Sequence, residues 1–323
     1  MLSLQDVESA AAVVYAAMPP TPQYAWPLLA RRTGCEVWVK HENHTPTGAF
    51  KVRGGLVYME RLKGDHPGVA GVISATRGNH GQSIALAAAR AGIAATIVVP
   101  QGNSVEKNAA MRAFGAELIE AGHDFDAARE VAMRLAGERG LSMVPSFHRD
   151  LVRGVATYAL ELFRAAPLLD TVYVPIGLGS GICGTIAVRD ALGLSTNVVG
   201  VVSTEAPAYA LSFAAGKVVQ TNSADTMADG MAVRGPDAEA LRVIVKGADR
   251  IVKVSDAEIA TAMRAYYEDT HQLTEGAGAA SLAALTQEGE RMAGKRVGVV
   301  LSGGNIDRPL YLRTLAGDFG ADG

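Results

Sequence analysis

Cysteine is scarce in this sequence, which has only Cys35 and Cys183 among 323 residues. The two lie far apart along the chain and form no paired spacing, so neither a disulfide framework nor a thiolate metal site is predicted. The seven histidines supply no metal motif either, because residues 41–44 (HENH) are one residue short of the zinc-protease spacing. We therefore expect no bound metal.

Long apolar runs and clustered positive charge are also absent. No charge-free stretch of about 18 apolar residues occurs, so no membrane span is expected. Residues 1–18 contain Asp6 and Glu8 and lack the basic leader of a signal peptide. The net charge is −3, and Lys and Arg are scattered along the chain and form no basic cluster, which argues against nucleic-acid binding. The expectation is a cytoplasmic protein that binds a small molecule.

Short apolar runs alternate along the chain with longer segments whose apolar residues recur with the period of a helix. This alternation repeats several times. The runs rich in Val and Ile are 36–42, 71–76, 95–100, 171–177, 197–203 and 296–304, and the helical segments include 54–62, 81–92, 106–116 and 256–271. Parallel strands need a crossover, which is usually a helix. We predict an α/β fold with parallel-rich sheets covered by helices, and a crossing between domains near residues 145–150.

A glycine-rich segment, residues 177–184 (GLGSGICG), follows one of these strands and opens a helical run. Backbone N–H groups at such a helix start form an anion site. The same segment also matches the glycine pattern of dinucleotide-binding proteins, through Gly179, Gly181 and Gly184. Glu205 follows about 20 residues further on, where such proteins have an acidic residue that binds the ribose. A nicotinamide or flavin enzyme, another phosphate site and a plain tight turn all remain open at this point.

A second segment, residues 47–54 (TGAFKVRG), places Lys51 at the start of an expected helix behind glycine and apolar neighbours. A lysine that forms a Schiff base must spend time unprotonated, and an apolar pocket lowers its pKa by penalising the charged form. For a lysine taken alone, a surface position is the common alternative. The neighbouring residues decide between the two interpretations.

The Lys51 segment resembles the lysine motif of the fold-type II pyridoxal-phosphate enzymes, the family of threonine dehydratase, serine dehydratase and serine racemase. Three more matches follow in the family's order: residues 74–82 (SATRGNHGQ), the glycine segment at Gly177, and residues 301–305 (LSGGN). The resemblance spans about residues 20–310. It implies pyridoxal 5'-phosphate as cofactor, attached to Lys51 as a Schiff base, and a tryptophan synthase β-like fold.

The resemblance also assigns roles to individual residues. The cofactor is expected to contact Phe50, Lys51, Asn79, Gly177, Leu178, Gly179, Ser180, Gly181, Gly230, Glu275 and Ser302, and the substrate Ser74, Thr76, Arg77, Gly78, Asn79 and His80. Among these, Asn79 resembles the side chain that contacts the cofactor's phenolic oxygen, and Ser302 the one that faces its pyridine nitrogen. A neutral hydroxyl there makes the ring a milder electron sink than an aspartate would, which suits elimination.

Arg77 departs from the family pattern of the racemase. It occupies the place where serine racemase has the serine that reprotonates Cα, and a guanidinium is a poor proton shuttle. Arg77 either pairs with a second substrate carboxylate, as in 3-hydroxyaspartate, or turns to solvent or a local acid. A metal site seen in some relatives is not expected, because Glu205 is followed at 206–211 by no second carboxylate.

The function predicted from the sequence is a carbon–oxygen lyase that converts threonine or serine to a 2-oxo acid and ammonia. Its alternatives are 3-hydroxyaspartate or phenylserine as substrate, a serine racemase-like activity, a dinucleotide-dependent oxidoreductase, and a silent cofactor-binding protein. The absence of a long region after Ser302 points to amino acid catabolism. We expect a large domain of residues 1–70 and 148–323, a small domain of residues 71–147, a site between them, and a homodimer.

Overall fold

The computed structural model describes residues 2–318 and contains two separate β-sheets. The larger has six strands in the order β1-β2-β10-β7-β8-β9, and only β1 runs antiparallel to its neighbour. Its strands are β1 (Gln23–Ala25), β2 (Glu36–His41), β7 (Thr171–Pro175), β8 (Asn197–Ser203), β9 (Arg250–Val254) and β10 (Arg296–Leu301). Helices cover it, so the predicted α/β class is confirmed.

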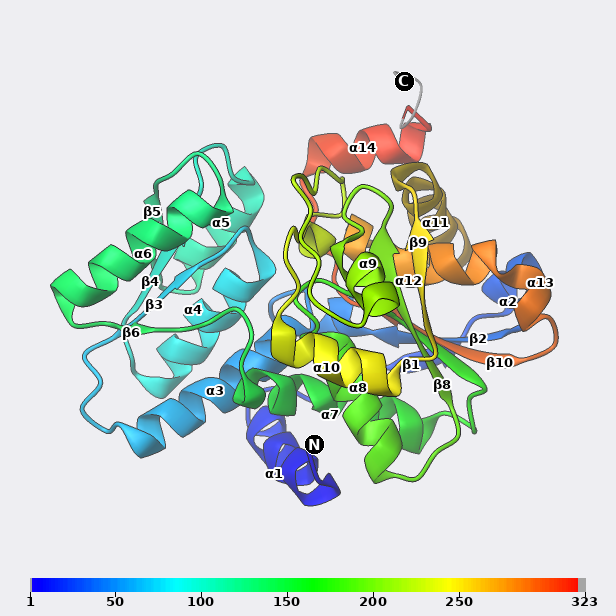
Figure 1. Ribbon diagram of the computed structural model, residues 1–323, viewed down its shortest axis with the longest axis horizontal. Coiled ribbons are helices and arrows are strands. Elements are labelled where there is room, and N and C mark those ends of the chain that lie inside the picture. The colour runs from blue at the N-terminus through cyan, green and yellow to red at the C-terminus, as the bar shows by residue number, and fades with distance from the viewer. Residues whose placement is uncertain (1, 319–323) are drawn as a thin grey trace.

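The smaller sheet is wholly parallel, with the order β5-β4-β3-β6. Its strands are β3 (Val72–Ala75), β4 (Ala95–Val99), β5 (Glu117–Glu120) and β6 (Ser142–Met143). β4 is buried along its whole length, as a central parallel strand covered on both faces should be. Figure 1 shows this sheet on the left with α4 (Asn79–Ala91), α5 (Val105–Ala113) and α6 (Phe125–Arg139), and the larger sheet on the right. The exact division into two domains stays a prediction.

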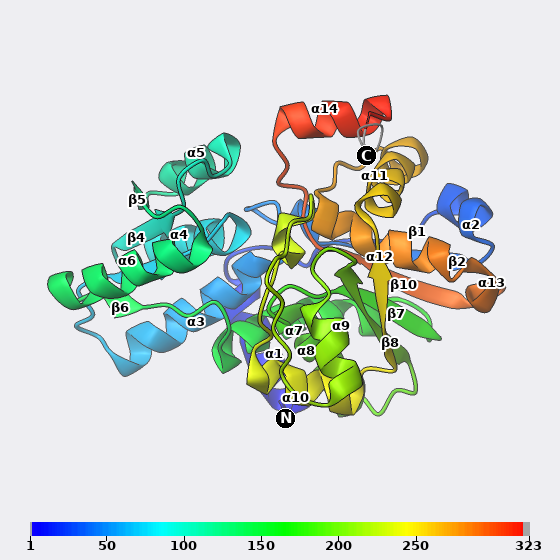
Figure 2. The same cartoon turned by 45° about the horizontal axis from the view of Figure 1, so that its top comes forward.

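The remaining helices mostly pack on or around the larger sheet, as the turned view of Figure 2 also shows. They are α1 (Leu4–Tyr15), α2 (Pro27–Thr33), α3 (Lys51–Asp65), α7 (Arg149–Ala165), α8 (Ser180–Ala191), α9 (Ala208–Ala215), α10 (Ala238–Gly247), α11 (Asp256–Thr270), α12 (Gly276–Gln287), α13 (Gly289–Met292) and α14 (Arg308–Ala316), with short 3-10 turns η1 (Glu42–His44) and η2 (Asp229–Met231). Among residues 2–318, none of the helices has the length and apolar character that crossing a membrane demands.

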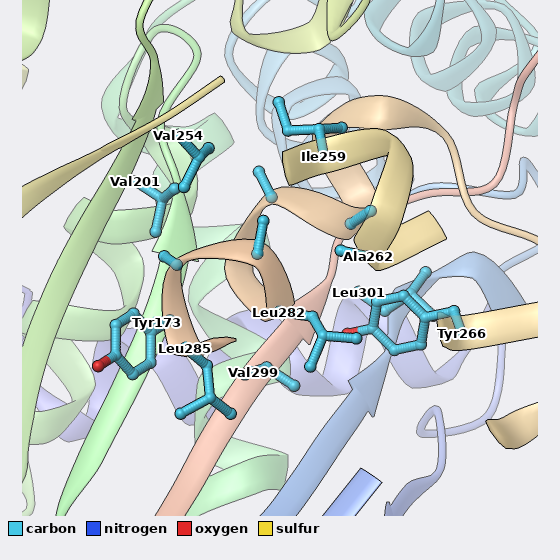
Figure 3. Packing of buried hydrophobic residues seen from close by; sticks show 14 of the residues in the cluster. Tyr173, Val201, Val254, Ile259, Ala262, Tyr266, Leu282, Leu285, Val299 and Leu301 are labelled. Carbon is cyan, nitrogen blue, oxygen red and sulfur yellow. The ribbon is translucent and has the colours of Figure 1, made fainter. Parts of the chain in front are cut away.

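Successive side chains of a strand point to opposite faces of the larger sheet, so its hydrophobic core consists of two clusters, one on each face. On β7, Val172 and Val174 belong to one buried cluster, with α7 and α8, while Tyr173 belongs to the other. On Tyr173's face, α12 brings Leu282 and Leu285 against β7 and β10, as Figure 3 shows. Both faces are therefore closed, and the site must lie at an edge or an end of the sheet.

A buried network of four charges fixes the start of α3 to its surroundings. The Arg53 guanidinium is fully buried and donates to Glu42 Oε2 at 2.7 Å and to Glu161 Oε1 at 2.6 Å. The buried Lys40 ammonium lies 2.5 Å from Glu161 Oε2. The two cations and two carboxylates balance in charge. The free-energy cost of burying them is therefore offset only while every partner is present. Because Arg53 follows Lys51 by two residues on α3, this network also holds Lys51 in place.

Candidate active site

The lysine segment and the C-terminal segment meet backbone to backbone. Lys51 is the first residue of α3, directly after Phe50, whose N–H donates to the Ser302 carbonyl oxygen at 3.0 Å. Ala49 and Gly303 form an isolated antiparallel bridge beside this bond. Two motifs from opposite ends of the sequence are thereby joined at the start of α3.

The Lys51 side chain is half-buried and points toward α8. Its Nζ lies 3.5 Å from Ser180 Oγ and 5.1 Å from the centroid of the Phe50 ring. Burial lowers the pKa of Lys51 to about 8, and the nearby Glu275 carboxyl opposes this only in part. A small cavity at this point is lined by Lys51, Gly54, His80, Ser146, Leu151, Val155 and Ser180. The structure thus holds an amine that is easily made neutral, which is the form a nucleophile or base requires.

The glycine segment forms the turn from β7 into α8. Gly179 has φ = 98°, a left-handed conformation that favours glycine, and a Cβ there would lie 2.8 Å from the Ala240 Cβ. A Cβ at Gly177 would overlap the carbonyl oxygen of Gly230. The Leu178 carbonyl accepts a hydrogen bond from the Tyr209 hydroxyl at 2.9 Å. Glycine is therefore required here by close backbone approach.

The loop between β3 and α4 is held largely by its own side chains. Ser74 Oγ donates to the Val144 carbonyl at 3.0 Å, and Thr76 Oγ1 accepts from the backbone N–H of Gly78 at 3.1 Å. The Ser74 hydroxyl is thus bound to the backbone after β6 and the Thr76 hydroxyl to the loop itself, and a contact with substrate stays a prediction for both. Arg77, by contrast, is exposed, and within residues 2–318 the structure gives its side chain no hydrogen bond or ion pair.

Asn79 and Glu275 join the start of α4, directly after the loop of residues 76–78, to the helix α12. Asn79 Nδ2 donates to Glu275 Oε1 at 2.7 Å, and the Glu275 side chain is buried at the start of α12. Burial raises the pKa of Glu275 to about 7, against the lowering effect of Lys107. His80 is also buried, which lowers its pKa to about 3, with a smaller contribution from Lys51. The imidazole of His80 is therefore neutral.

One ion pair at the site was not predicted from the sequence. The Lys107 ammonium pairs with the Asp229 carboxylate, and a Cβ at Gly78 would lie 2.5 Å from Lys107 Cδ. Lys107 belongs to α5 and Asp229 to η2, so this pair connects the elements of the two sheets directly over the loop of residues 76–80. No pattern in the sequence around Lys107 distinguishes it from a surface lysine on a helix.

Comparison with known proteins agrees with this geometry. A family model described as pyridoxal-phosphate dependent enzyme matches residues 14–303. The chain belongs to this family. An L-threonine ammonia-lyase from Thermotoga maritima is 33% identical over 308 residues, which cover 95% of this chain and 76% of the relative. An L-threo-3-hydroxyaspartate ammonia-lyase from Pseudomonas sp is 32% identical over 316 residues, which cover 98% and 99%. The structure of maize serine racemase superposes with a TM-score of 0.90 at 27% identity, covering 97% of each chain.

The residues gathered here fit pyridoxal phosphate. The first turn of α8 has no side-chain cap, so its backbone N–H groups suit a phosphate. Glu275 Oε2 and His80 Nε2 are buried polar atoms for which the described residues provide no partner. Family membership favours pyridoxal phosphate over a dinucleotide as the cofactor, and binding of its phosphate by residues 177–184 stays a prediction.

The close approach at Gly177 gives a direct test of the glycine turn. Gly177→Ala is expected to weaken binding of pyridoxal phosphate by about 5- to 100-fold, because the added methyl must displace the Gly230 backbone. Titration of the apo-protein with the cofactor, followed by absorbance, measures this change. The matched control is Gly137→Ala on α6, where a Cβ meets nothing within 4 Å. Equal affinity in both variants would contradict the assignment of this turn.

Proposed function

We propose that this chain is a pyridoxal-phosphate-dependent ammonia-lyase that converts a β-hydroxy amino acid, threonine or serine first, to a 2-oxo acid and ammonia. The observation that carries the proposal is the Lys51 amine, whose pKa is lowered to about 8 at the meeting point of the motifs. Its support from outside the structure is the similarity to ammonia-lyases over almost the whole chain.

In this proposal each element of the site holds one part of the ligand. The turn of residues 177–181 with Ser180 holds the cofactor's phosphate, the Ser302 hydroxyl faces the pyridine nitrogen, and Asn79 faces the phenolic oxygen. Phe50, Gly230 and Glu275 complete the walls of the pocket. The loop of residues 76–80 binds the α-carboxylate of the substrate through hydroxyl and backbone N–H groups. The position of Ser180 and Phe50 beside the Lys51 side chain supports this proposal.

Bound pyridoxal phosphate supplies an electron sink for the pair of electrons left at Cα when its proton is lost. The neutral Lys51 amine accepts that proton, and the α-carboxylate loop keeps the Cα–H bond directed toward Lys51. The neutral His80 imidazole adds no positive charge beside Lys51, so the amine stays a competent base. The neutral Ser302 hydroxyl suits loss of the β-hydroxyl in the same step.

A racemase is disfavoured by the residue at position 77. Racemisation requires an acid and a base on opposite faces of Cα, and the guanidinium of Arg77 is a poor proton shuttle. The similarity in fold to maize serine racemase does not separate the two activities. We therefore retain the dehydratase as the proposed reaction.

A second candidate substrate, 3-hydroxyaspartate, is favoured by the guanidinium of Arg77, which has no partner among residues 2–318. The side chain is exposed beside the substrate loop, and Arg pairs bidentately with a carboxylate. The Pseudomonas relative of nearly equal length is named for this substrate. Phenylserine has no such feature in its favour.

Arg77→Ala distinguishes these substrates. If Arg77 binds a second carboxylate, the variant is expected to lose about 10- to 100-fold in kcat/KM for 3-hydroxyaspartate, while kcat/KM for threonine and serine changes little. Arg129→Ala, which removes an exposed arginine from α6, is the control for net charge. Equal losses on all substrates would assign Arg77 a role unrelated to the distal carboxylate.

We also propose that the two sheets are the cores of two domains with the predicted boundaries, with the site in the cleft between them. The separation of the strands into two sheets supports this division. The homodimer and the cytoplasmic location stay predictions from the family resemblance and the sequence.

A further inference from the structure

Three side chains form a hydrogen-bonded row beside the lysine segment. Asn305 Nδ2 donates to the Thr47 carbonyl oxygen at 2.7 Å and to Asn79 Oδ1 at 2.8 Å. Asn79 Nδ2 in turn donates to Glu275 Oε1 at 2.7 Å. The row runs from a backbone carbonyl on the loop before Lys51 to a buried carboxyl at the start of α12.

The direction of every hydrogen bond in this row is fixed from its ends. The Thr47 carbonyl has no hydrogen, so Asn305 must turn its NH2 group toward it, and Asn305 then also donates to Asn79. At the other end Glu275 Oε1 accepts. If the Asn79 amide were flipped, its oxygen would face the Glu275 oxygen and its NH2 would face the Asn305 NH2, so both bonds would be lost.

The row is also held by close packing at two glycines. A Cβ at Gly48 would lie 2.7 Å from Asn305 Oδ1, and a Cβ at Gly303 would lie 2.7 Å from Glu275 Oε1. The backbone N–H of Glu275 donates to the Gly303 carbonyl at 3.1 Å. Glu275 and Asn305 therefore have little room to move, and the orientation of Asn79 between them is set in advance.

The Asn79 amide has one hydrogen left for a ligand. Of its two N–H groups, one is used by Glu275, and its oxygen is turned toward Asn305. Asn79 is half-buried, and the other buried acceptor in the row, Glu275 Oε2, has no partner among residues 2–318. Asn79 can therefore still donate one N–H to a ligand.

We propose that Glu275 is a positioning residue that, together with Asn305, holds Asn79 so that it presents an N–H to the phenolic oxygen of the bound cofactor. That oxygen is then bound as an acceptor, and its deprotonated form is favoured. This inference rests on the proposed function, which places the phenolic oxygen at Asn79. Beside its place in the pocket wall, it adds a role for Glu275 that acts through Asn79.

A double-mutant cycle on the cofactor-loaded protein tests the proposal. The readout is the visible spectrum of bound pyridoxal phosphate against pH, with the cofactor's dissociation constant as a second measurement. Asn79→Ala and Glu275→Leu are each expected to displace the pH midpoint of the yellow form by about one unit, a tenfold change in that equilibrium, in the same direction. The double variant is expected to move no further than the larger single change, because both substitutions remove one interaction.

The conservative variant Glu275→Gln separates the hydrogen bond from the charge. Glutamine keeps an acceptor oxygen at the position of Oε1, so its spectrum and cofactor affinity are expected to stay within about twofold of wild type. If Glu275→Leu does not fold, Asn305→Ala, which removes the donor on the other side of Asn79, takes its place in the cycle with the same expected shift.

Three results would overturn the proposal: shifts that add fully in the double variant, a wild-type spectrum in Glu275→Leu beside a changed one in Asn79→Ala, or a Glu275→Gln variant as altered as Glu275→Leu. Failure of the proposed function has a different signature, because the cofactor-loaded wild-type protein would then release neither 2-oxo acid nor ammonia, whatever the spectra of the variants.

Discussion

Lys51→Ala is expected to lower turnover of every β-hydroxy amino acid by about 10⁴-fold or more, because the variant loses the amine that lies 3.5 Å from Ser180 Oγ and serves as base in the proposed reaction. Loss of the yellow absorption that pyridoxal phosphate shows when it is attached to a lysine should accompany the loss of activity. Ammonia release measured with purified wild type and variant at equal cofactor concentration checks the prediction.

Two further variants make the result specific to the amine. Lys51→Arg keeps the positive charge but not the ability to become neutral near pH 8, so it is expected to be as inactive as the alanine variant. Lys217→Ala removes an exposed lysine after α9 and is expected to leave turnover unchanged. Activity retained by Lys51→Arg would show that neutral amine chemistry is not required.

Arg53→Met is expected to lower the free energy of unfolding by about 3–5 kcal/mol, the largest stability effect foreseen for this chain. The buried Glu42 and Glu161 carboxylates would lose the guanidinium that donates to both, and Lys40 alone would remain to compensate two charges. Arg53→Lys is expected to cost nearly as much, because a lysine cannot reproduce the planar set of donors. Unfolding by urea, followed by circular dichroism, gives the measurement.

The matched control lies on the same helix. Arg61 is exposed and pairs with Asp65 four residues further on, so Arg61→Met should change stability by less than about 1 kcal/mol. A loss below about 1 kcal/mol for Arg53→Met would mean that the buried network does not contribute as its geometry implies. The network then would not be what fixes the start of α3.

Six strands of this fold were readable from the sequence because each is a short apolar run rich in β-branched residues, whereas β1, β5, β6 and β9 were not predicted. The run 36–42 becomes β2 (Glu36–His41), and 95–100 becomes β4 (Ala95–Val99). The helix α12 gave no such signal, since residues 276–287 are small and apolar on every side and carry no amphipathic period. The order of the strands depends on contacts between distant segments, and so it appears only in the folded chain.

The same contrast holds for the site. Lys51 and the glycine turn were found because their chemistry requires particular residues next to one another in sequence. The Lys107–Asp229 pair and the row through Asn305 join residues that are far apart in the chain. Lys107 has no local pattern of its own, and the match at residues 301–305 does not tell which residue Asn305 contacts, so only the folded structure shows these pairings.

The central claim is tested most directly by measuring 2-oxo acid and ammonia released from L-threonine, L-serine, the 3-hydroxyaspartate isomers and phenylserine by the purified, cofactor-loaded protein. The account predicts equal amounts of the two products from at least one of these substrates, and none from Lys51→Ala. A protein that takes up pyridoxal phosphate yet releases neither product from any of them would contradict it.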